Sequence, residues 1–286
     1  MRVTVFGATG VVGRALLPLL GEHEVTAVSR SPRDEPGARW VVADAATGEG
    51  VENAVDGAEV VYYFVHSLGS QDFEEQDRVA AETVAGAAAR AGAQQIVYLG
   101  GLGADDPDAS PHLRSRRETG ERLALAGVPV TTLRAAMIVG KDSAAFETIK
   151  GLVKRLPVMI TPTWVSTPTQ PVALADVARY LAGVCGNEAA RGEGYDVGGP
   201  EVMTYREMIE RIARLLGRRP LIVEVPVLTP YLSSLWLNLV TPVSASVARP
   251  LVEGLRNPTI AREERIRELL PFELTPFDVA AREALA

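Results

Sequence analysis

The spacing of three glycines near the start of the chain limits the possible folds more than any other feature. Gly7, Gly10 and Gly13 lie three residues apart in RVTVFGATGVVGRALL (residues 2–17), between a run typical of a strand and a pattern typical of a helix. Gly7 permits a tight turn, Gly10 lets the backbone approach a ligand without a Cβ, and Gly13 permits close packing of helix on strand. The segment therefore predicts a turn that binds the diphosphate of a dinucleotide.

Backbone amides of this turn are predicted to hold the diphosphate. The amides of Thr9, Gly10, Val11 and Val12 lie at the expected start of the helix, where the helix dipole favours an anion. A glycine-rich turn with a purely structural role is the alternative. Pro18 lies late in the same helix and removes a hydrogen bond there, so we expect that helix to be short or kinked.

Short apolar runs alternate with helical patterns through the first half of the chain. The runs are rich in β-branched and aromatic residues, which suits strands buried on both faces. They cover residues 2–6, 24–29, 40–44, 59–65, 95–99 and 129–138. Between the fourth and fifth runs, the spacing of apolar residues from Ala80 to Ala91 predicts a crossover helix that stops at Gly92. This alternation predicts an α/β fold with a parallel sheet.

The second half of the chain follows a different pattern. Helices are predicted over residues 176–184 and 204–217, with a short strand at 194–199 between them. Prolines become frequent after about Ser143, which is typical of an irregular lobe. We therefore expect a core of residues 1–142, completed by about 169–199, and a substrate lobe of residues 143–168 and 200–286.

The end of the second predicted strand is expected to select the cofactor. An acidic side chain there would hold a ribose 2′-hydroxyl, whereas a basic one accepts a 2′-phosphate. The strand ends in Ser29 and Arg30, with Arg33 close behind, which favours NADP(H). Solvated loop charges are the alternative for the two arginines. Asp44 ends the third strand, where it either accepts a hydrogen bond from the adenine amino group or forms a turn.

The composition limits which classes of binding partner and which cellular compartment are expected. A net charge of −7 and a pI of about 5.2 argue against nucleic acid and favour a small molecule. Cys185 has no second cysteine to pair with, and we expect a buried, inert thiol. Without an export signal at the N-terminus, a cytoplasmic protein is expected. The most apolar window, residues 221–240, contains a glutamate and two prolines, so we expect no integral membrane segment.

The motifs together resemble those of a known superfamily. They are FGATGVVG, Asp44, VYYFVHS, QIVYLGGLG, LRAAMIVG, QPVALADVA and YDVGGPEVMTYREMIERIARLLG, in this order. The chain is similar to atypical or extended short-chain dehydrogenases/reductases, in the branch that includes NmrA-like redox sensors and the related complex I accessory subunit. The resemblance implies a doubly wound Rossmann sheet of order 3-2-1-4-5-6 with a seventh strand, and a smaller, mainly helical C-terminal substrate lobe.

The resemblance also implies where the site lies. Phe64, Val65 and His66 are expected along the ribose and nicotinamide of the cofactor, although His66 capping a loop is an equal alternative. Active members of the superfamily carry a Ser or Thr after the fifth strand and a Tyr-x-x-x-Lys pair on the next helix. This chain departs from that pattern, because it has LGG (residues 99–101) in the serine region and places His112 and Arg116 at the Tyr and Lys spacing.

Two accounts of this departure stay open. His112 acts as an alternative acid while Arg116 fixes the cofactor ribose, or the site binds NADP(H) without turning it over. No metal is indicated, because the three histidines are not grouped with cysteine or carboxylates at ligand spacing.

The C-terminal lobe is expected to supply an apolar substrate cleft. The residues that suggest it, by composition alone, are Trp164, Tyr231, Leu232, Leu235, Trp236 and Leu237. The function expected first is an NADPH-dependent reductase that acts on an apolar carbonyl, enone or quinone-like molecule. Its alternatives are a non-catalytic NADP(H) sensor or assembly protein, and a redox-neutral isomerase or epimerase. A monomer or a homodimer is expected.

Overall fold

A seven-stranded parallel sheet forms the centre of the computed structural model, which describes residues 1–67, 72–106, 109–225 and 257–286. Its strand order is β3-β2-β1-β4-β5-β6-β11. The strands are β1 (Arg2–Phe6), β2 (Glu24–Ser29), β3 (Arg39–Val42), β4 (Val60–Tyr63), β5 (Gln95–Gly101), β6 (Val130–Ala135) and β11 (Gly194–Val197). Every neighbouring pair is parallel. The order expected from the resemblance, including the seventh strand, is confirmed.

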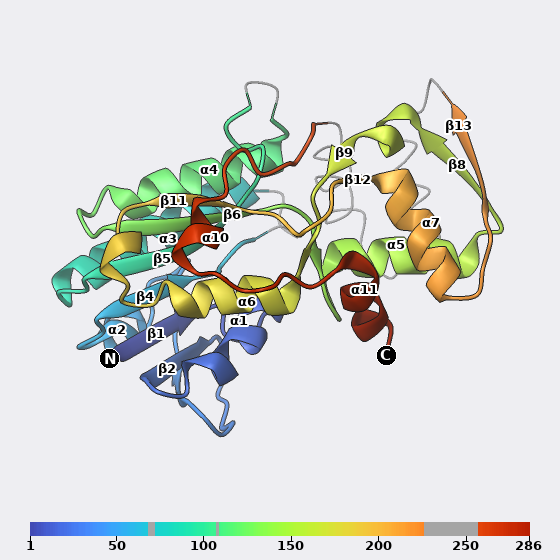
Figure 1. Ribbon diagram of the computed structural model, residues 1–286. Helices are drawn as coiled ribbons and strands as arrows, with labels where there is room; N and C mark the ends of the chain where they lie inside the picture. Colours follow the sequence, from blue (N-terminus) through green and yellow to red (C-terminus); the bar gives the residue numbers. More distant parts are fainter. Residues whose placement is uncertain (68–71, 107–108, 226–256) are drawn as a thin grey trace.

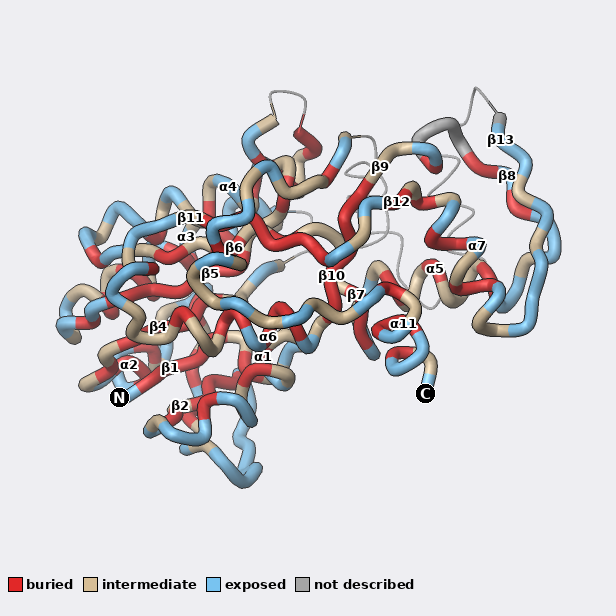
Figure 2. The backbone as a smooth tube through the Cα atoms, viewed as in Figure 1, coloured by how far each residue is buried: buried red, intermediate tan, exposed pale blue. Residues whose placement is uncertain are grey.

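Helices cover both faces of this sheet, so that its central strands are buried (Figures 1 and 2). One face packs against α1 (Val11–Leu16) and α6 (Leu174–Gly183), and the other packs against α2 (Val51–Val55), α3 (Phe73–Arg90) and α4 (Pro111–Ala124). Alternation along β1 explains the two layers, because Val3 and Val5 join the first core while Phe6 joins the second. The chain therefore buries two separate apolar cores, one on each face.

A smaller lobe follows β6 in the chain. Its third core is built by α5 (Ala144–Arg155), α7 (Tyr205–Leu215) and α11 (Phe277–Leu285). Three two-stranded sheets accompany them: β7 (Ile138–Val139) with β10 (Val172–Ala173), β9 (Pro168–Thr169) with β12 (Met203–Thr204), and β8 (Val158–Pro162) with β13 (Leu221–Val225). Short helices are η1 (Leu17–Leu20), η2 (Thr163–Ser166), η3 (Glu188–Ala190) and α10 (Arg265–Leu269). Ile266 of α10 packs into the first core of the sheet. The division of the chain into a core and a substrate lobe, with the bounds expected from the sequence, stays a prediction.

Three predicted strands are too long. The third, predicted over residues 40–44, ends at Val42 in β3. The fourth ends at Tyr63 rather than at residue 65, because its neighbour β1 ends at Phe6 and the chain then turns at Gly7. The run predicted over residues 129–138 splits, since β6 pairs with β5 and β11 only as far as Ala135. The next residues change partner and pair with β10 instead.

Pro18 shortens the first helix as expected. The α-helix ends at Leu16, and the chain continues as the 3₁₀ helix η1, with proline in its first turn. The break leaves Leu16 and Leu20 fully buried in the first core. Among the described residues, no helix is long and apolar enough to cross a membrane.

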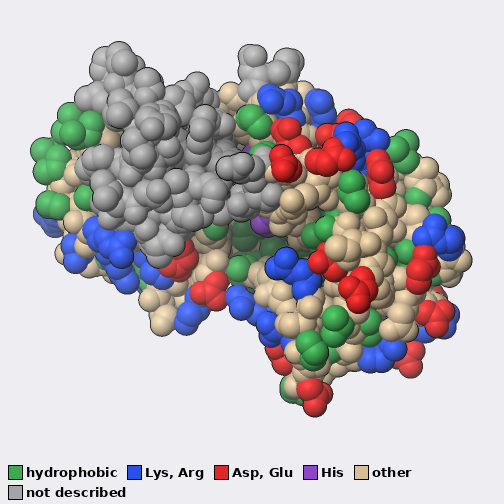
Figure 3. All heavy atoms as spheres, turned by 180° about the vertical axis from the view of Figure 1, so that it is seen from behind, with side chains coloured by type: hydrophobic (Ala, Val, Ile, Leu, Met, Phe, Trp, Pro, Cys, Tyr) green, Lys and Arg blue, Asp and Glu red, His purple; other side chains and the backbone are tan. Residues whose placement is uncertain are grey.

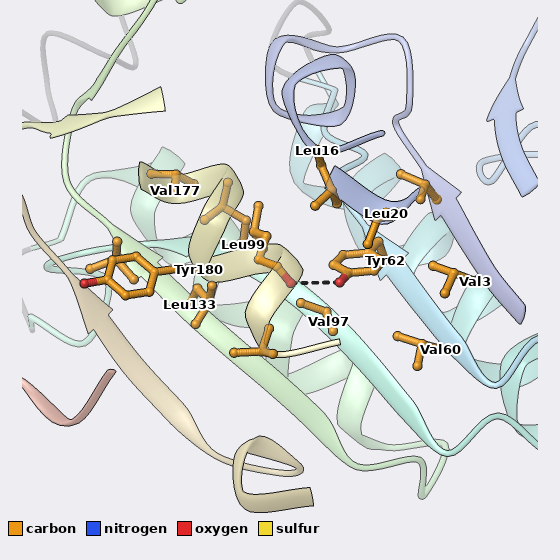
Figure 4. Close-up of a cluster of buried hydrophobic side chains, with 14 of the residues drawn as sticks. Val3, Leu16, Leu20, Val60, Tyr62, Val97, Leu99, Leu133, Val177 and Tyr180 are labelled. Atoms are coloured by element: carbon orange, nitrogen blue, oxygen red, sulfur yellow. Dashed lines mark hydrogen bonds between the residues drawn. The ribbon is translucent and has the colours of Figure 1, made fainter. Parts of the chain in front are cut away.

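Buried polar side chains tie α6 to the sheet. The Tyr62 hydroxyl donates to the Leu181 carbonyl over 2.8 Å (Figure 4). Gln95 is fully buried; its Nε2 donates to the Thr131 hydroxyl and the Val184 carbonyl, and its Oε1 accepts from the Gly186 amide. Periodicity could not have singled out Gln95, because it stands in a strand among apolar residues and its partners lie 36 to 91 residues away.

Gln95→Leu should therefore destabilise the fold. It leaves the Gly186 amide without its acceptor, whereas the Val184 carbonyl keeps the hydrogen bond from the Asn187 amide. We therefore expect a loss of about 1 to 3 kcal/mol in the free energy of unfolding. The neighbouring Gln94→Leu is a matched control, because Gln94 is exposed. Urea unfolding of both variants measures the difference, and equal losses would contradict the role given to Gln95.

Candidate functional site

The carboxyl ends of β1, β4, β5 and β6 open into one cavity of about 420 Å³, at the edge where parallel sheets bind ligands. Glycine and apolar groups make most of its wall. The polar side chains that line it are His66, His112, Arg116, Asp142, Ser143, Tyr205 and Thr259. Seen from behind, the molecule has a hollow with hydrophobic side chains and a histidine in it (Figure 3). A volume of this size suits a small-molecule site.

The glycine turn forms one wall of this cavity. Gly7 has a φ of 82°, and the Gly10 amide donates to the Gly7 carbonyl over 3.0 Å before α1 begins at Val11. A Cβ at Gly13 would lie 2.4 Å from the Gly7 oxygen, so only glycine fits there. Gly10, Val11 and Val12 line the cavity, whereas Thr9 does not. The open cradle beside these glycines fits the diphosphate of a dinucleotide.

The loop after β4 forms the adjoining wall. This loop lies close to the glycine turn, because a Cβ at Gly7 would be 3.0 Å from the backbone of Phe64. Phe64 and His66 line the cavity. Val65 points away and packs against the second core, so its predicted contact with the cofactor has no support in the lining residues. That Phe64 and His66 contact the ribose and nicotinamide of the cofactor stays a prediction.

The structure brings both predicted histidines to the same cavity. Burial lowers the pKa of His112 to about 3, with further lowering by the Arg116 guanidinium and by His66. The side chain of His66 is more exposed than that of His112. The protein atoms around its ring still remove water from it, and together with the Arg116 guanidinium they lower its pKa to about 4. Both rings are therefore neutral imidazoles near pH 7. A neutral imidazole N–H donates a hydrogen bond, but an imidazolium acid is not present in this state.

Arg116 is held by β5. Its Nη2 donates to the Leu99 carbonyl, and its guanidinium lies 5.2 Å from the centre of the Tyr98 ring. The Tyr98 hydroxyl in turn donates to the Arg116 carbonyl over 2.8 Å. These contacts fix the cation at the cavity wall. The remaining guanidinium donors are those that the predicted ribose contact would use.

Packing is tight at Gly101 but not at Gly100. A Cβ at Gly101 would lie 3.0 Å from Leu113 of α4, so the end of that leucine would have to shift by a few tenths of an ångström. A Cβ at Gly100 would lie 3.4 Å from the Tyr98 ring, which is an ordinary contact. Packing therefore disfavours a side chain at 101 without excluding one, and it gives no reason for glycine at 100.

The adenine end of the predicted site lies outside the cavity. Arg30 is exposed, and no carboxylate pairs with it in the described part of the chain. Arg33 pairs with Glu35 at 2.6 Å, and the Ser29 hydroxyl donates to the Ser31 carbonyl. Arg30 is therefore the stronger candidate for a 2′-phosphate.

Asp44 forms a turn in this structure. Its Oδ1 accepts a hydrogen bond from the Ala46 amide over 2.8 Å, which is one of the two roles expected for it. The adenine contact stays a prediction. Trp164 lies in η2, and the other lobe residues proposed for the cleft, Tyr231, Leu232, Leu235, Trp236 and Leu237, lie outside the described residues.

Sequence reasoning missed two side chains of the site, Asp77 and Tyr205. Asp77 of α3 is buried and accepts hydrogen bonds from the Ser67 amide at 2.7 Å and the Ser115 hydroxyl, which anchors the loop of His66. Burial raises the pKa of Asp77. Tyr205 reaches the cavity from the first turn of α7. A helical pattern predicts α7 but does not show that its start meets a cavity.

An ion pair crosses from the glycine turn to the lobe. Arg14 of α1 pairs with Asp142 at 2.9 Å, and Asp142 lines the cavity with a left-handed φ of 65°. The two residues lie 128 positions apart in the chain, so no local pattern could have joined them.

This combination of a doubly wound parallel sheet, a glycine cradle and a cavity over the strand ends defines a Rossmann-type dinucleotide-binding protein. The chain belongs to the NAD(P)H-binding family, whose model matches residues 7–150. The resemblance to atypical short-chain dehydrogenases/reductases, with a complex I subunit among the relatives, is confirmed.

Two relatives illustrate the range of the family. The chain is 30% identical over 224 residues to (4-alkanoyl-5-oxo-2,5-dihydrofuran-3-yl)methyl phosphate reductase of Streptomyces griseus, with 76% of this chain and 74% of the relative covered. It is 25% identical to the mitochondrial NADH dehydrogenase [ubiquinone] 1 alpha subcomplex subunit 9 of Arabidopsis thaliana, with 78% of this chain and 60% of that protein covered. The chain thus spans less than two thirds of the complex I subunit.

Solved structures share the fold. Triphenylmethane reductase of Citrobacter sp. with NADP(H) has a TM-score of 0.80 at 19% identity, covering 99% of this chain and 100% of that one. The NADPH-dependent quinone oxidoreductase of Escherichia coli with NADPH has the same score and identity, with full coverage of both chains.

The two cavity histidines are expected to remain neutral in mild acid. Their pKa values lie below the ordinary 6.5, so lowering the pH from 8 to 5 should leave both rings unprotonated. Imidazole proton shifts in NMR spectra, assigned by the signals missing in His66→Gln and His112→Gln, measure this directly. A midpoint above pH 6 for His112 would contradict the environment described.

Proposed function

We propose that the protein is an NADPH-dependent reductase of an apolar, uncharged carbonyl, enone or quinone-like molecule. One observation carries the proposal: a single cavity joins the glycine turn to a mainly apolar wall that contains two neutral histidines. Membership of an NAD(P)H-binding family that includes a reductase supports it. When bound, the cofactor supplies the hydride.

The proposed roles of the residues follow from their positions. Amides of the turn at residues 10–12 hold the diphosphate, and Phe64 with His66 positions the ribose and nicotinamide. A neutral His112 donates a hydrogen bond to the substrate oxygen, which stabilises the negative charge that develops there. Because no side chain in the described cavity repeats the Tyr-x-x-x-Lys arrangement, water supplies the final proton.

The charge of the cavity supports an uncharged substrate. Arg116 is the cation among the described lining residues, and its guanidinium already binds the Leu99 carbonyl and stacks on Tyr98. A phosphate ester carries about two charges and is bound by several cationic donors in proteins. We therefore propose that this protein does not share the phosphate-bearing substrate in the name of its Streptomyces relative.

A second candidate is a non-catalytic NADP(H) sensor. The observation in its favour is the replacement of the serine region by Gly100 and Gly101, together with His112 at the tyrosine position. In this case cofactor binding changes affinity for another protein without turnover.

A substrate panel separates these functions. Steady loss of NADPH absorbance with quinones, enones or ketones is expected of the reductase, and His112→Gln should lower kcat by about 10- to 100-fold, in the range of a lost transition-state hydrogen-bond donor. Cofactor affinity should stay within about threefold, because His112 is not among the residues proposed to hold the cofactor. Binding without any turnover supports the sensor instead. Interconversion of a sugar nucleotide without net NADPH loss would indicate an isomerase.

Cofactor preference tests Arg30. Arg30→Ala is expected to weaken NADPH binding by about 10- to 100-fold, since a hydrogen bond to a charged group contributes about 1.5 to 3 kcal/mol. NADH binding should hardly change, because NADH has no 2′-phosphate. Arg39→Ala is the control. Arg39 is exposed and lies at the start of β3, whereas Arg30 follows the end of the parallel neighbouring strand β2. Titration calorimetry with both cofactors measures the effect, and a wild-type preference for NADH would refute the proposed NADP(H) specificity.

A further inference from the structure

The small sheet of β8 and β13 exposes one apolar face. Val158 and Ile160 of β8 are 46% and 53% exposed, and Leu221 and Val223 of β13 are 61% and 39% exposed. The parallel register pairs Leu221 with Val158 and Val223 with Ile160, which places all four side chains together. The residues between them point inward, as Met159 shows by being buried in the third core. Alternate residues of both strands therefore present aliphatic side chains to solvent.

Basic residues surround the start of this face. The stretches 151–160 and 212–223 contain five cations and no Asp or Glu, although the whole chain has a net charge of −7. Glu224, the next residue of β13, is paired with Arg206 at 2.8 Å. The cations are Lys154, Arg155, Arg214, Arg218 and Arg219, all exposed. Since the strands are parallel, the cations that precede them meet at one end, where the Leu221 amide donates to the Pro157 carbonyl. Figure 3 shows hydrophobic side chains beside a group of Lys and Arg at this edge of the molecule.

Helix capping explains only part of this charge. Cations in the last turns of α5 and α7 complement the helix dipoles. Arg218 and Arg219 lie beyond the end of α7, however, and the dipole does not require exposed aliphatic residues on the strands that follow. Both features are accounted for by a partner that is anionic at its surface and apolar beneath it.

We propose that the β8–β13 face docks on an anionic lipid bilayer. The basic residues bind lipid headgroups, and the four aliphatic side chains enter the boundary between headgroups and acyl chains. A second copy of the chain fits less well, because a stable protein interface buries about 800 Å² on each partner, and four half-covered side chains offer far less. Nucleic acid would leave the apolar face unused.

The proposed docking places the cavity near the bilayer. Helix α5 begins at the cavity with Ala144 and ends at the basic cluster with Arg155. Its twelve residues extend about 18 Å at 1.5 Å per residue. A docked protein would thus hold its cavity about one helix length from a phase in which apolar molecules dissolve. The docking itself does not depend on the proposed substrate.

Vesicle flotation tests the proposal with the full-length protein. Wild type should bind vesicles of phosphatidylglycerol with phosphatidylcholine at about 0.1 M salt, where the Debye length is about 10 Å, and bind at least tenfold less at about 1 M salt. Vesicles of phosphatidylcholine alone should bind at least tenfold less. Failure to bind the anionic vesicles at the lower salt concentration would overturn the proposal.

Paired variants locate the binding surface. Arg218→Glu with Arg219→Glu should lower the partition coefficient at least tenfold. Arg39→Glu with Arg117→Glu makes the same charge change at exposed positions of the sheet domain and should lower it less than threefold. Ile160→Ser with Leu221→Ser should also lower it at least tenfold, compared with Leu19→Ser and Leu125→Ser at exposed positions outside the face. NADPH binding and thermal unfolding confirm that each variant is folded.

Other binding partners of the β8–β13 face would give different results in these experiments. A dimer in solution that Ile160→Ser with Leu221→Ser converts to a monomer would make this face an interface between copies and refute the lipid proposal. Equal losses in the control variants would show that net charge alone governs binding, which also refutes a docking face.

Discussion

The site depends first on the meeting of β1 and β4 at their carboxyl ends. A side chain at Gly7 would lie 3.0 Å from the backbone of Phe64, so the turn that cradles a diphosphate and the loop that carries His66 can share one cavity only with glycine there. A φ of 82° at the same residue adds a second reason for glycine. Two strands that are adjacent in the sheet but far apart in the sequence thereby form one binding surface.

Electrostatics in that cavity follow from what surrounds it. Arg116 is fixed by Leu99 and Tyr98, and its charge with the burial of the site keeps both histidines neutral. Asp77 lies behind this group, where it accepts hydrogen bonds from the Ser67 amide and the Ser115 hydroxyl. The cavity thus has a polar wall that donates hydrogen bonds without the Tyr-x-x-x-Lys pair of the superfamily, next to walls made mostly of apolar groups.

Local patterns predicted the parts of the fold that local physics determines. The glycine turn, the crossover helix ending at Gly92 and the break at Pro18 all depend on residues within a few positions of one another. The strand order and the site came from the resemblance. Three contacts join segments that are far apart in the chain, where the sequence carries no periodic signal. They are the pairing of β8 with β13, the approach of Tyr205 to the cavity and the contact of Arg14 with Asp142. For the same reason the end of β6 was misplaced, since it depends on a change of partner strand.

The contact between Gly101 and Leu113 sets how easily a side chain could be restored in this stretch. A Cβ at position 101 would lie 3.0 Å from the end of the Leu113 side chain, which would have to move by a few tenths of an ångström. A Cβ at position 100 would meet the Tyr98 ring at 3.4 Å, an ordinary contact distance. The backbone of β5 thus leaves room for a hydroxyl-bearing residue after a small readjustment, so the histidine-lined wall is a property of the present side chains and not of the scaffold.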